Sequence, residues 1–600
     1  MIRPRLHLSL RACAVAALAA ATVSPAFAVS YTWVPKSGTG DWTTSLNWTG
    51  TSATDLYPGS TTATDSANAS GDLVGDLTLN LDTSVSIQNL FIGDTTGTTT
   101  SGTFYTTTVS TTNNSTLTFA AASTATNLAQ INNAGGVNNG TANLLTPNII
   151  VNSGTLEVRK NLSQGGGASV QNNIVISGNV TSGNAGGHQL RFTPVRDSTP
   201  SSLLEYSGNI SNGVGSINMV FRVDSGTTPH THTLRLSGTG NTFTGGITFN
   251  GGRPGTATLE SSPASGTVGA LSTGALTLGT SGSTATLNLG GSLSTVTEVC
   301  NINAGGTGPR QIAVIGAGNR ILSGIVNATT TGTLTLACSS AGNLTFSNAF
   351  NGTGPVTINS TGSGKVIFAG AGSTFSGPTT VQAGGLQLGA GSPLGTSTIT
   401  PVAGGTLSLS PYATTTVGGL APNAGGLTDL GNGFLSVTSG LTATDLVTAI
   451  VAGRNGGSWD GTTGITSSTV AAAVAAGSPR AVGWLDNGDG SVSAAYAAPG
   501  DTNIDWSIDI LDASNFLAGG KFDAGVPATW NEGDFSYDGI VDILDAADFF
   551  ATGLYDAGNY NTAPGAAGGV AAVPEPTGLG TVVVALAAAM ALRRRHSSHG

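Results

Sequence analysis

The sequence predicts a mainly β fold: a right-handed parallel β-helix, or solenoid, followed by a small α-helical module and a C-terminal hydrophobic helix. Three observations lead to this prediction. A Gly/Thr/Ser-rich tract contains one pattern twice, as GTGNTFTGGITFNGG from Gly238 and GAGSTFSGPTTVQAGG from Gly370. An acidic segment that begins at Asp501 is repeated from Asp534, and a long apolar run follows it. Repetition of this kind indicates stacked or paired structural units.

The composition also favours stacked strands. Charged residues make up 8% of the 600 residues, aromatic residues 6%, and there are 90 glycines, which is unlike an ordinary cytosolic enzyme. The hydrophobic residues, 39% of the chain, recur in regular alternation with small polar ones. This pattern favours a stacked β structure over a solvated coil.

Residues 1–28 have the features of a secretory signal peptide. Three arginines precede an apolar run at 12–21, and Ala26-Phe27-Ala28 offers a cleavage site. Cleavage there removes Cys13 and leaves Cys300 and Cys338. In an oxidising compartment these two cysteines either pair or stay as buried thiols, and both possibilities remain open.

Residues 29–130 are predicted to form an N-terminal β cap and the first strands. Trp33, Trp42 and Trp48 lie within sixteen residues of one another. If buried, they would shield the first turn of a solenoid from edge pairing. If exposed, they could stack on sugar rings. The cap is the preferred interpretation.

Residues 131–440 are predicted to form the solenoid. Short segments in which apolar and small polar residues alternate, each closed by Gly, Asn or Ser, indicate strands at 275–278, 334–336, 343–346, 365–368 and 386–388. So short a strand cannot bury its apolar face alone, so successive turns of roughly 20 residues must stack.

The repeated pattern also resembles a known family. NTFTGGITFNGG and STFSGPTTVQAGGLQLGAGSPLG are similar to the autotransporter-associated β-strand repeat of secreted bacterial proteins. The resemblance implies an extended, surface-exposed β-helix, and it implies no particular chemistry.

Parallel β-helices also carry polysaccharide lyases and hydrolases, whose chemistry needs paired acids, or a carboxylate and a base, in one cleft. The charges between 29 and 499 are instead scattered, with convergence of Glu205 and Asp224 left open. His230 and His232 have a spacing that zinc or copper could use, but solvent-facing histidines on an edge strand are preferred. The sequence therefore predicts no enzyme. The scattered charges are Glu157, Arg159, Lys160, residues 191–197, Glu205, Asp224, Glu260 and Glu298.

Residues 441–498 have a different pattern. Apolar residues at helical spacing predict short helices at 442–452 and 467–476. A strand pair is expected at 481–484 and 491–496, joined by the turn Asp486-Asn487-Gly488-Asp489-Gly490. The turn is interpreted as a plain hairpin turn and not as a cation site.

Residues 499–562 carry the acidity of the chain. The segment 501–561 has 12 acidic residues and one basic residue, Lys521, whereas the rest of the chain has 19 of each. The net charge of −11 therefore belongs to this module and says nothing about partners of the whole protein.

This module contains one segment twice, first from Asp501 and again from Asp534. In each copy oxygen-bearing side chains occupy positions 1, 3, 5, 9 and 12 of a twelve-residue loop, and position 7 adds a carbonyl. Calcium takes six to eight such oxygen ligands, so two calcium sites are predicted, the alternative being acidic turns without metal. The ligands are Asp501, Asn503, Asp505, Ser507, Asp509 and Asp512, and then Asp534, Ser536, Asp538, Ile540, Asp542 and Asp545.

The two loops differ at position 6, where the chain turns sharply. The second loop has Gly539 there, but the first has Trp506, which tolerates a positive φ poorly. We therefore expect the first loop to be distorted or weaker, although Ser536 makes the side-chain ligands of the second less complete.

Paired loops of this kind, with Asp at position 12 and one helix after each, resemble a type I dockerin. The resemblance implies calcium binding by the loops and cohesin binding by the helices. Positions 10 and 11, usually small or polar in that family, are Ile510-Leu511 and Ile543-Leu544 here. We expect these four residues, with Phe516, Leu517, Phe549 and Phe550, to pack the copies together instead of forming a partner surface.

Residues 563–600 form a linker and a tripartite tail. Val573-Pro574-Glu575-Pro576 precedes an apolar run at 577–592 and then Arg593-Arg594-Arg595. This tail resembles the PEP-CTERM sorting signal, which implies recognition by an exosortase, cleavage near the motif and delivery to the cell surface or matrix. The run 577–592 would contact the membrane transiently, the alternative being a permanent anchor.

Together these features predict a non-enzymatic, secreted cell-surface or extracellular-matrix protein. The alternative is a carbohydrate-active β-helix that binds or cleaves polysaccharide and is docked through its dockerin-like module. A third hypothesis is an adhesin for a cell or a protein. The partners considered are extracellular polysaccharide and a cohesin-like protein, and no nucleic acid is expected.

Overall fold

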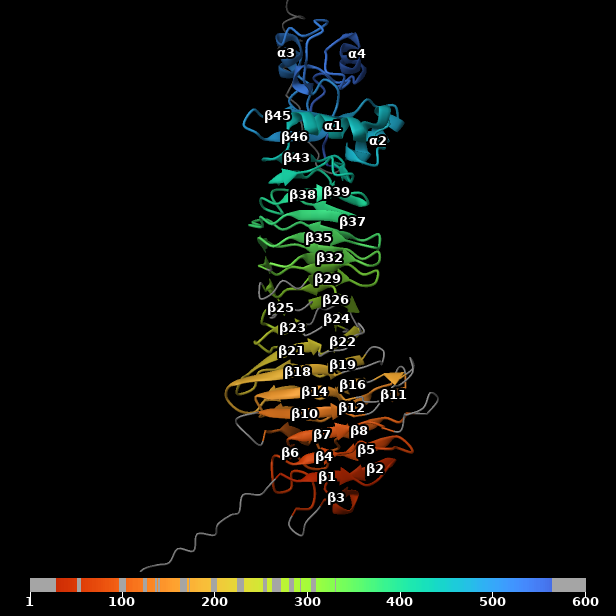
Figure 1. The fold of residues 1–600 in the computed structure, drawn as a ribbon, viewed down its shortest axis with the longest axis vertical. Helices are drawn as coiled ribbons and strands as arrows, with labels where there is room; N and C mark the ends of the chain where they lie inside the picture. Colours follow the sequence, from red (N-terminus) through yellow and green to blue (C-terminus); the bar gives the residue numbers. More distant parts are fainter. Residues whose placement is uncertain are drawn as a thin grey trace, which may run out of the picture. The chain divides into compact units, whose positions relative to one another are not determined.

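The protein is mainly β, with most strands in parallel sheets (Figure 1). It falls into two compact units, one up to Gly385 and one from Leu386. The predicted signal peptide and sorting tail lie outside the described residues, apart from Ala28 and Ala563. The computed structural model describes residues 28–50, 55–95, 104–121, 127–134, 137–138, 141–161, 170–171, 173–195, 202–223, 231–251, 256–261, 271–279, 285–291, 293–303, 309–329 and 331–563.

In the first unit the strands form three sets of neighbours. The first set is a 13-stranded sheet in which β3 pairs antiparallel at one edge and the other pairs are parallel. In sheet order its strands are β3 Trp48–Thr49, β1 Ser30–Trp33, β4 Ser66–Asn68, β7 Asn89–Ile92, β10 Leu128–Asn133, β14 Thr155–Asn161, β18 Gly187–Val195, β21 Ser216–Val223, β23 Ile247–Gly251, β25 Leu276–Leu278, β28 Cys300–Ile302, β31 Val326–Ala328 and β34 Phe350–Gly352.

The second set is also parallel, and each strand pairs with the next of the set along the chain. It contains β2 Gly38–Asp41, β5 Leu77–Asn80, β8 Thr107–Ser110, β12 Asn143–Leu145, β16 Ile174–Ile176, β19 Ser202–Tyr206, β22 Thr231–Leu236, β24 Thr256–Ser261, β26 Ala285–Gly291, β29 Arg310–Val314, β32 Leu334–Cys338 and β35 Val356–Asn359. β35 pairs in turn with β37, Thr379–Leu388.

The third set has two parallel groups. One contains β6 Val85–Ile87, β9 Thr116–Phe119, β13 Asn148–Val151, β17 Val180–Ser182 and β20 Ile210–Ser211. The other contains β27 Thr295–Val296, β30 Arg320–Leu322, β33 Leu344–Phe346 and β36 Lys365–Phe368. A separate antiparallel pair is formed by β11 Val137–Asn138 and β15 Val170–Gln171.

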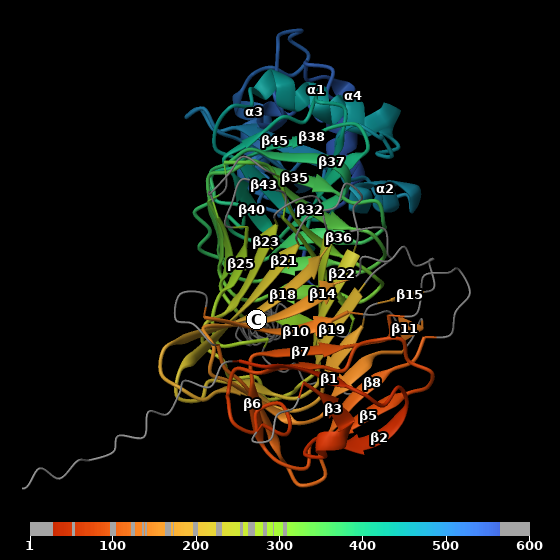
Figure 2. The ribbon, with the colours of Figure 1, turned by 60° about the horizontal axis from the view of Figure 1, so that its bottom comes forward.

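Between β28 and β36, consecutive strands belong to the three sets in turn. Each strand from β31 on therefore pairs with the strand three places before it in the chain. Leu334 lies beside Arg310, and Val356 lies beside Leu334, so one round of the three sets brings the chain back beside its own previous strand. The strands predicted at 275–278, 334–336, 343–346, 365–368 and 386–388 are confirmed as β25, β32, β33, β36 and the end of β37. Figure 1 shows β10, β14, β18 and β21 following one another in chain order, and Figure 2 shows the same four strands close together from a second side.

Side chains stack between neighbouring strands of the first unit. Inside, the rings of Phe346 and Phe368 are parallel, with centroids 4.7 Å apart. Outside, Asn327 donates to the side-chain oxygen of Asn301 at 2.9 Å and accepts a bond of 3.4 Å from Asn351. Such ladders of identical residues fix the register of parallel strands, because a slip of one residue would break them.

The tryptophans at the N-terminal edge are buried, as the cap interpretation requires. Trp33, Trp42 and Trp48 are each at most 3% exposed, and the ring of Trp48 meets the other two edge to face at 4.7 and 5.0 Å. The indole nitrogen of Trp42 donates to the carbonyl of Pro58 at 3.0 Å. None of the three presents an open aromatic face to a sugar.

Two predictions on single residues are resolved in the first unit. Cys300 and Cys338 are both buried free thiols and do not form a disulfide, and burial raises the pKa of Cys300 to about 12. The expectation of a solvent-facing histidine is wrong for His232. This residue is buried on β22, where its Cα neighbours are Ser202 and Ala257 of the flanking strands. His230 lies outside the described residues.

The second unit continues with strands and then adds helices. The predicted helices are confirmed as α1 Ala443–Arg454 and α2 Ser468–Ala475, and the predicted hairpin as β45 Ala481–Asp486 with β46 Val492–Ala497. The sheet β40-β43-β46-β45 joins this hairpin to two parallel strands. The other strands are β38 Thr398–Pro401, β39 Gly405–Leu409, β40 Thr414–Val417, β41 Gly419–Leu420, β42 Leu427–Asp429, β43 Phe434–Val437 and β44 Gly464–Thr466.

Candidate calcium-binding module

The acidic duplication folds as two loop-and-helix copies. α3 spans Ile510–Ala518 and α4 spans Ile543–Ala551, so a single helix follows each predicted loop. Asp509 and Asp542 cap the two helices, and the position-12 residues Asp512 and Asp545 complete a capping box at each. The residues predicted as calcium ligands therefore also start the helices.

The two loops share one set of hydrogen bonds. The carboxylate of Asp501 accepts from the amides of Asp505 and Trp506 at 3.2 and 2.9 Å. The carboxylate of Asp534 accepts from the amides at the equivalent positions, 538 and 539, at 3.2 and 3.0 Å. Asp512 and Asp545 each accept from the amide of position 9 at 2.9 Å. The loops are thus near copies in geometry as well as in sequence.

The prediction that Trp506 distorts the first loop is wrong for the backbone. Trp506 adopts φ +69°, in the same left-handed region as Gly539 at +88°. A bulky residue stays there only when its surroundings hold it. The Trp506 indole nitrogen donates to the carbonyl of Tyr496 at 3.0 Å, and its own carbonyl accepts from the amide of Tyr560 at 2.9 Å. Contacts outside the loop therefore enforce the turn.

The two copies are tied to each other by a reciprocal exchange. The amide of Asp523, after α3, donates to the carbonyl of Val541 in the second loop at 2.9 Å. The amide of Asp556, after α4, donates to the carbonyl of Ile508 in the first loop at 2.8 Å. Each loop is closed by the segment that follows the helix of the other copy.

The electrostatics of the loops are unusual. Asp501, Asp512, Asp534 and Asp545 are at most 4% exposed, and within the described residues no Lys, Arg or His forms an ion pair with any of them. Burial is the main reason that the pKa of Asp501 is raised to about 7 and that of Asp534 to about 6, and neighbouring carboxylates raise both further. Burial also raises the pKa of Asp545. A cation between these groups would favour their charged form and lower these pKa values.

The remaining predicted ligands lie around these buried acids. Asn503, Ser507, Asp509, Ser536, Ile540 and Asp542 are half-buried, and Asp505 and Asp538 are exposed. The position-5 and position-9 carboxylates accept bonds from backbone amides two residues ahead, for example Asp505 from Ser507 at 2.9 Å. In the part of the chain that the structure describes, no three His, Cys, Asp or Glu side chains converge closely enough to hold a metal ion. A bound cation would require the exposed side chains to turn inward.

The sequence patterns did not point to three aromatic residues that hold the loops in place. The hydroxyl of Tyr560 donates to Asp501 and accepts from the amide of Ala498 at 3.0 Å. The indole of Trp530, fully buried, donates to the carbonyl of Asp501 at 2.7 Å. The hydroxyl of Tyr537 donates to the carbonyl of Val482 at 2.8 Å. These partners are distant in sequence, so no local pattern could have shown them.

The expected packing between the copies is only partly right. Phe516 and Phe549 do pack together, with ring centroids 5.9 Å apart. The expected burial of the other six residues between the copies is wrong, because each of them is 60% exposed or more. They are Ile510, Leu511, Leu517, Ile543, Leu544 and Phe550.

Of the charged residues considered for catalysis, Glu157, Arg159, Arg191 and Glu205 form ion pairs, and Glu298 accepts a hydrogen bond from the amide of Ser272 at 3.0 Å. Glu157 lies 3.9 Å from Arg191 and 3.8 Å from Arg159, and Glu205 lies 3.2 Å from Arg235. Opposite charges on adjacent strands stabilise a sheet in this way. Asp224, the other candidate for convergence with Glu205, lies outside the described residues.

Comparisons of this chain with family models, with curated proteins and with solved structures return no match. Among the residues described, no helix combines the length and the apolar character that a membrane crossing requires.

Proposed function

We propose that this chain is a non-enzymatic, secreted cell-surface or matrix protein, in which a β-solenoid stalk carries a calcium-stabilised, dockerin-like module. The observation that carries the proposal is the pair of loops with four buried carboxylates and no cationic partner among the described residues. Burying unpaired carboxylates is costly, so a module that keeps them is built for a cation.

The proposed stalk is a right-handed parallel β-helix. The rotation of consecutive strands through three sets, in which β32 pairs with β29 and β35 with β32, supports this fold. Two rows of identical side chains also support a β-helix: the stacked Phe346 and Phe368, and the ladder of Asn301, Asn327 and Asn351. Identical side chains align in this way only when successive turns are superposed. The outward side chains described above form ion pairs and amide ladders, which suits a structural surface.

The residues fit calcium by their chemistry. The two sets that would hold it are Asp501, Asn503, Asp505, Ser507, Asp509 and Asp512, and Asp534, Ser536, Asp538, Ile540, Asp542 and Asp545. These are hard oxygen donors, which calcium prefers, and the cation would supply the positive charge that the buried carboxylates lack. The chain's own residues set the loop: the position-12 aspartates start the helices, and Tyr560 and Trp530 hold the first loop in place.

The module would stabilise the part of the second unit that precedes it, residues 441–498. Tyr560 bonds to Ala498 and Tyr537 to Val482. In addition, the guanidinium of Arg454 in α1 lies 5.4 Å from the ring centre of Tyr537, and that of Arg480 lies 5.3 Å from the ring centre of Tyr560. A cation that orders the loops would therefore also order this junction.

The test is calcium binding by the whole purified chain, followed by calorimetry and tryptophan fluorescence. We expect calcium to bind and to raise the unfolding temperature of the second unit, and we expect Asp501→Asn and Asp534→Asn each to weaken binding by about tenfold or more. Asp489→Asn, in the exposed β45–β46 turn, is the matched control and should leave binding unchanged. A chain that ignores calcium in both measurements would refute the calcium proposal.

The export route rests on sequence alone. We propose that residues 1–28 direct secretion and that the tail, with Pro574-Glu575-Pro576, is recognised by an exosortase-type enzyme. Deleting 574–576 in a host that sorts such tails should leave the protein uncleaved and associated with the cell. Normal release of that deletion variant would refute this part of the proposal.

A further inference from the structure

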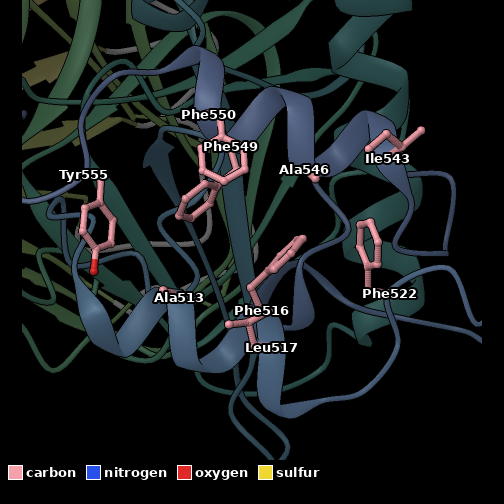
Figure 3. A pocket seen from close by; sticks show the side chains of 9 residues that line it. All are labelled: Ala513, Phe516, Leu517, Phe522, Ile543, Ala546, Phe549, Phe550 and Tyr555. Atoms are coloured by element: carbon pink, nitrogen blue, oxygen red, sulfur yellow. The ribbon is translucent and has the colours of Figure 1, made fainter.

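The two helices of the module enclose an apolar groove, which we call the helix-pair groove. It has a volume of about 580 Å³, and in Figure 3 Phe516 and Phe549 lie between the helices, with Tyr555 and Phe522 near its opposite ends. It is lined by Ala513, Phe516, Leu517, Phe522, Ile543, Ala546, Phe549, Phe550 and Tyr555.

The helix-pair groove is an open surface of the kind that proteins usually cover. Phe550 is 78% exposed, Leu517 72% and Ile543 69%, and all three belong to the one groove. Clustered exposed side chains of this size mark a binding surface, in contrast to single exposed apolar residues, which are common. The groove also lies within the segment that carries the net charge of −11.

We propose that the helix-pair groove binds the chain's own apolar C-terminal segment, residues 577–592. The described residues end at Ala563, shortly after the groove residue Tyr555, and residues 564–576 link that point to the segment. Fully extended, this link spans about 46 Å. A compact module of this length is about 27 Å across, so the segment reaches every part of its surface.

The sequence of the segment matches the groove in chemistry. Its larger apolar residues include Leu579, Val583, Leu586 and Met590, separated by four, three and four positions. This is the spacing of anchors in segments that lay one apolar face in a groove. Arg593-Arg594-Arg595 follows directly, and these positive charges complement the acidic module.

Binding of this kind would shield the apolar segment until a membrane competes for it. The module would then act as an internal cover, keeping the same side chains from aggregating before export is complete. This role goes beyond the proposed function and holds whether or not the loops take calcium.

The test is photocrosslinking in the chain that carries its C-terminal segment. A photoreactive benzoylphenylalanine replaces Phe550, whose exposure lets the fold accept it, and mass spectrometry identifies the crosslinked peptide. We expect a crosslink to residues 577–592 in a monomer-sized product, at a yield independent of protein concentration. The same probe in place of Leu46, which is 87% exposed in the first unit, should give no such product.

A second variant changes the groove itself and leaves the photoreactive probe in place. Leu517→Glu should lower the crosslink yield at least tenfold without shifting the unfolding temperature, whereas Leu46→Glu should leave the yield unchanged. A crosslink to 577–592 that forms only in dimer-sized product and grows with concentration would mean that a second copy fills the groove, and would overturn the proposal. Absence of any crosslink to 577–592 would overturn it as well.

Discussion

Single residues decide how the acidic module behaves without metal. Asp501 and Asp534 are buried and have raised pKa values of about 7 and about 6, so the folded module holds protons that an unfolded chain releases near pH 4. Trp506 takes a left-handed conformation that its own chemistry disfavours, because Tyr496 and Tyr560 hold it. Local residue preferences are therefore overridden at this site by contacts from elsewhere in the second unit.

The raised pKa values predict a pH dependence. Since folding raises the pKa of Asp501 and Asp534, their protonation stabilises the folded state fully below about pH 4, and this stabilisation is lost as the pH rises through 6 and 7. We expect the second unit of the calcium-stripped chain to unfold at a lower temperature at pH 8 than at pH 5. Calorimetry in chelator measures this, and the double variant D501N/D534N should flatten the dependence. An unfolding temperature that rises between pH 5 and 8 would contradict the prediction.

Tyr560→Phe tests the residue that sequence reasoning missed. The substitution keeps the ring under Arg480 but removes the hydroxyl's bonds with Asp501 and with the amide of Ala498. We expect the unfolding free energy of the second unit to fall by about 2 kcal/mol, as measured by denaturant titration. Tyr555→Phe removes a half-exposed hydroxyl and is the control. If the two substitutions lower the unfolding free energy equally, the Tyr560 hydroxyl stabilises the second unit no more than a half-exposed hydroxyl does, which would contradict the prediction.

At the level of elements, stability in the first unit comes from stacking between neighbours. Many strands of each set have inward apolar and outward polar side chains, so apolar residues one round of the sets apart, such as Ile312, Leu336 and Ile358, become neighbours. This is why short strands that could not fold alone form regular sheets. It also means that a substitution acts mainly on its own strand and the two beside it.

Asn327→Ala tests this picture. Asn327 is the middle member of its ladder and bonds to Asn301 and Asn351. Its loss should destabilise the strands around it by about 1 to 2 kcal/mol, seen as faster amide exchange in β28, β31 and β34. Exchange in β4 and β7 serves as the internal control and should not change. Uniform acceleration over the whole sheet would contradict nearest-neighbour stability.

The elements named from the sequence were predictable because their signals are local. Alternating residues predicted β25, β32, β33 and β36, helical spacing predicted α1 and α2, and the acidic duplication predicted the two loops with their helices. The environment of these elements was not predictable. The burial of His232, the exposure of Ile510 and Leu544, and the bonds of Tyr560 depend on which distant segments meet, and no pattern within a strand or helix encodes that.

On the scale of the whole molecule, the net negative charge of the chain is concentrated in the acidic module of the second unit. The first unit is built from small polar and apolar residues, whereas both acidic loops lie in the second unit. The two units should therefore respond differently to the same solution conditions.

Chelation tests this separation. Removing calcium from the whole chain with EDTA should lower the unfolding temperature of one calorimetric transition, that of the second unit, and leave the other unchanged. The reason is that every proposed ligand lies between Asp501 and Asp545. Equal shifts of both transitions would contradict the assignment, and restoring calcium should reverse the change.

The reciprocal closure of the two loops has a consequence for the origin of the module. The segment after each helix bonds to the loop of the other copy, through Asp523 and Val541 and through Asp556 and Ile508. One copy alone has a loop that it cannot close and a segment with no loop to bind. Two separate single-copy chains would satisfy both needs by pairing about a twofold axis. A tandem gene duplication would then have fused such a homodimer into one polypeptide, making its assembly independent of protein concentration.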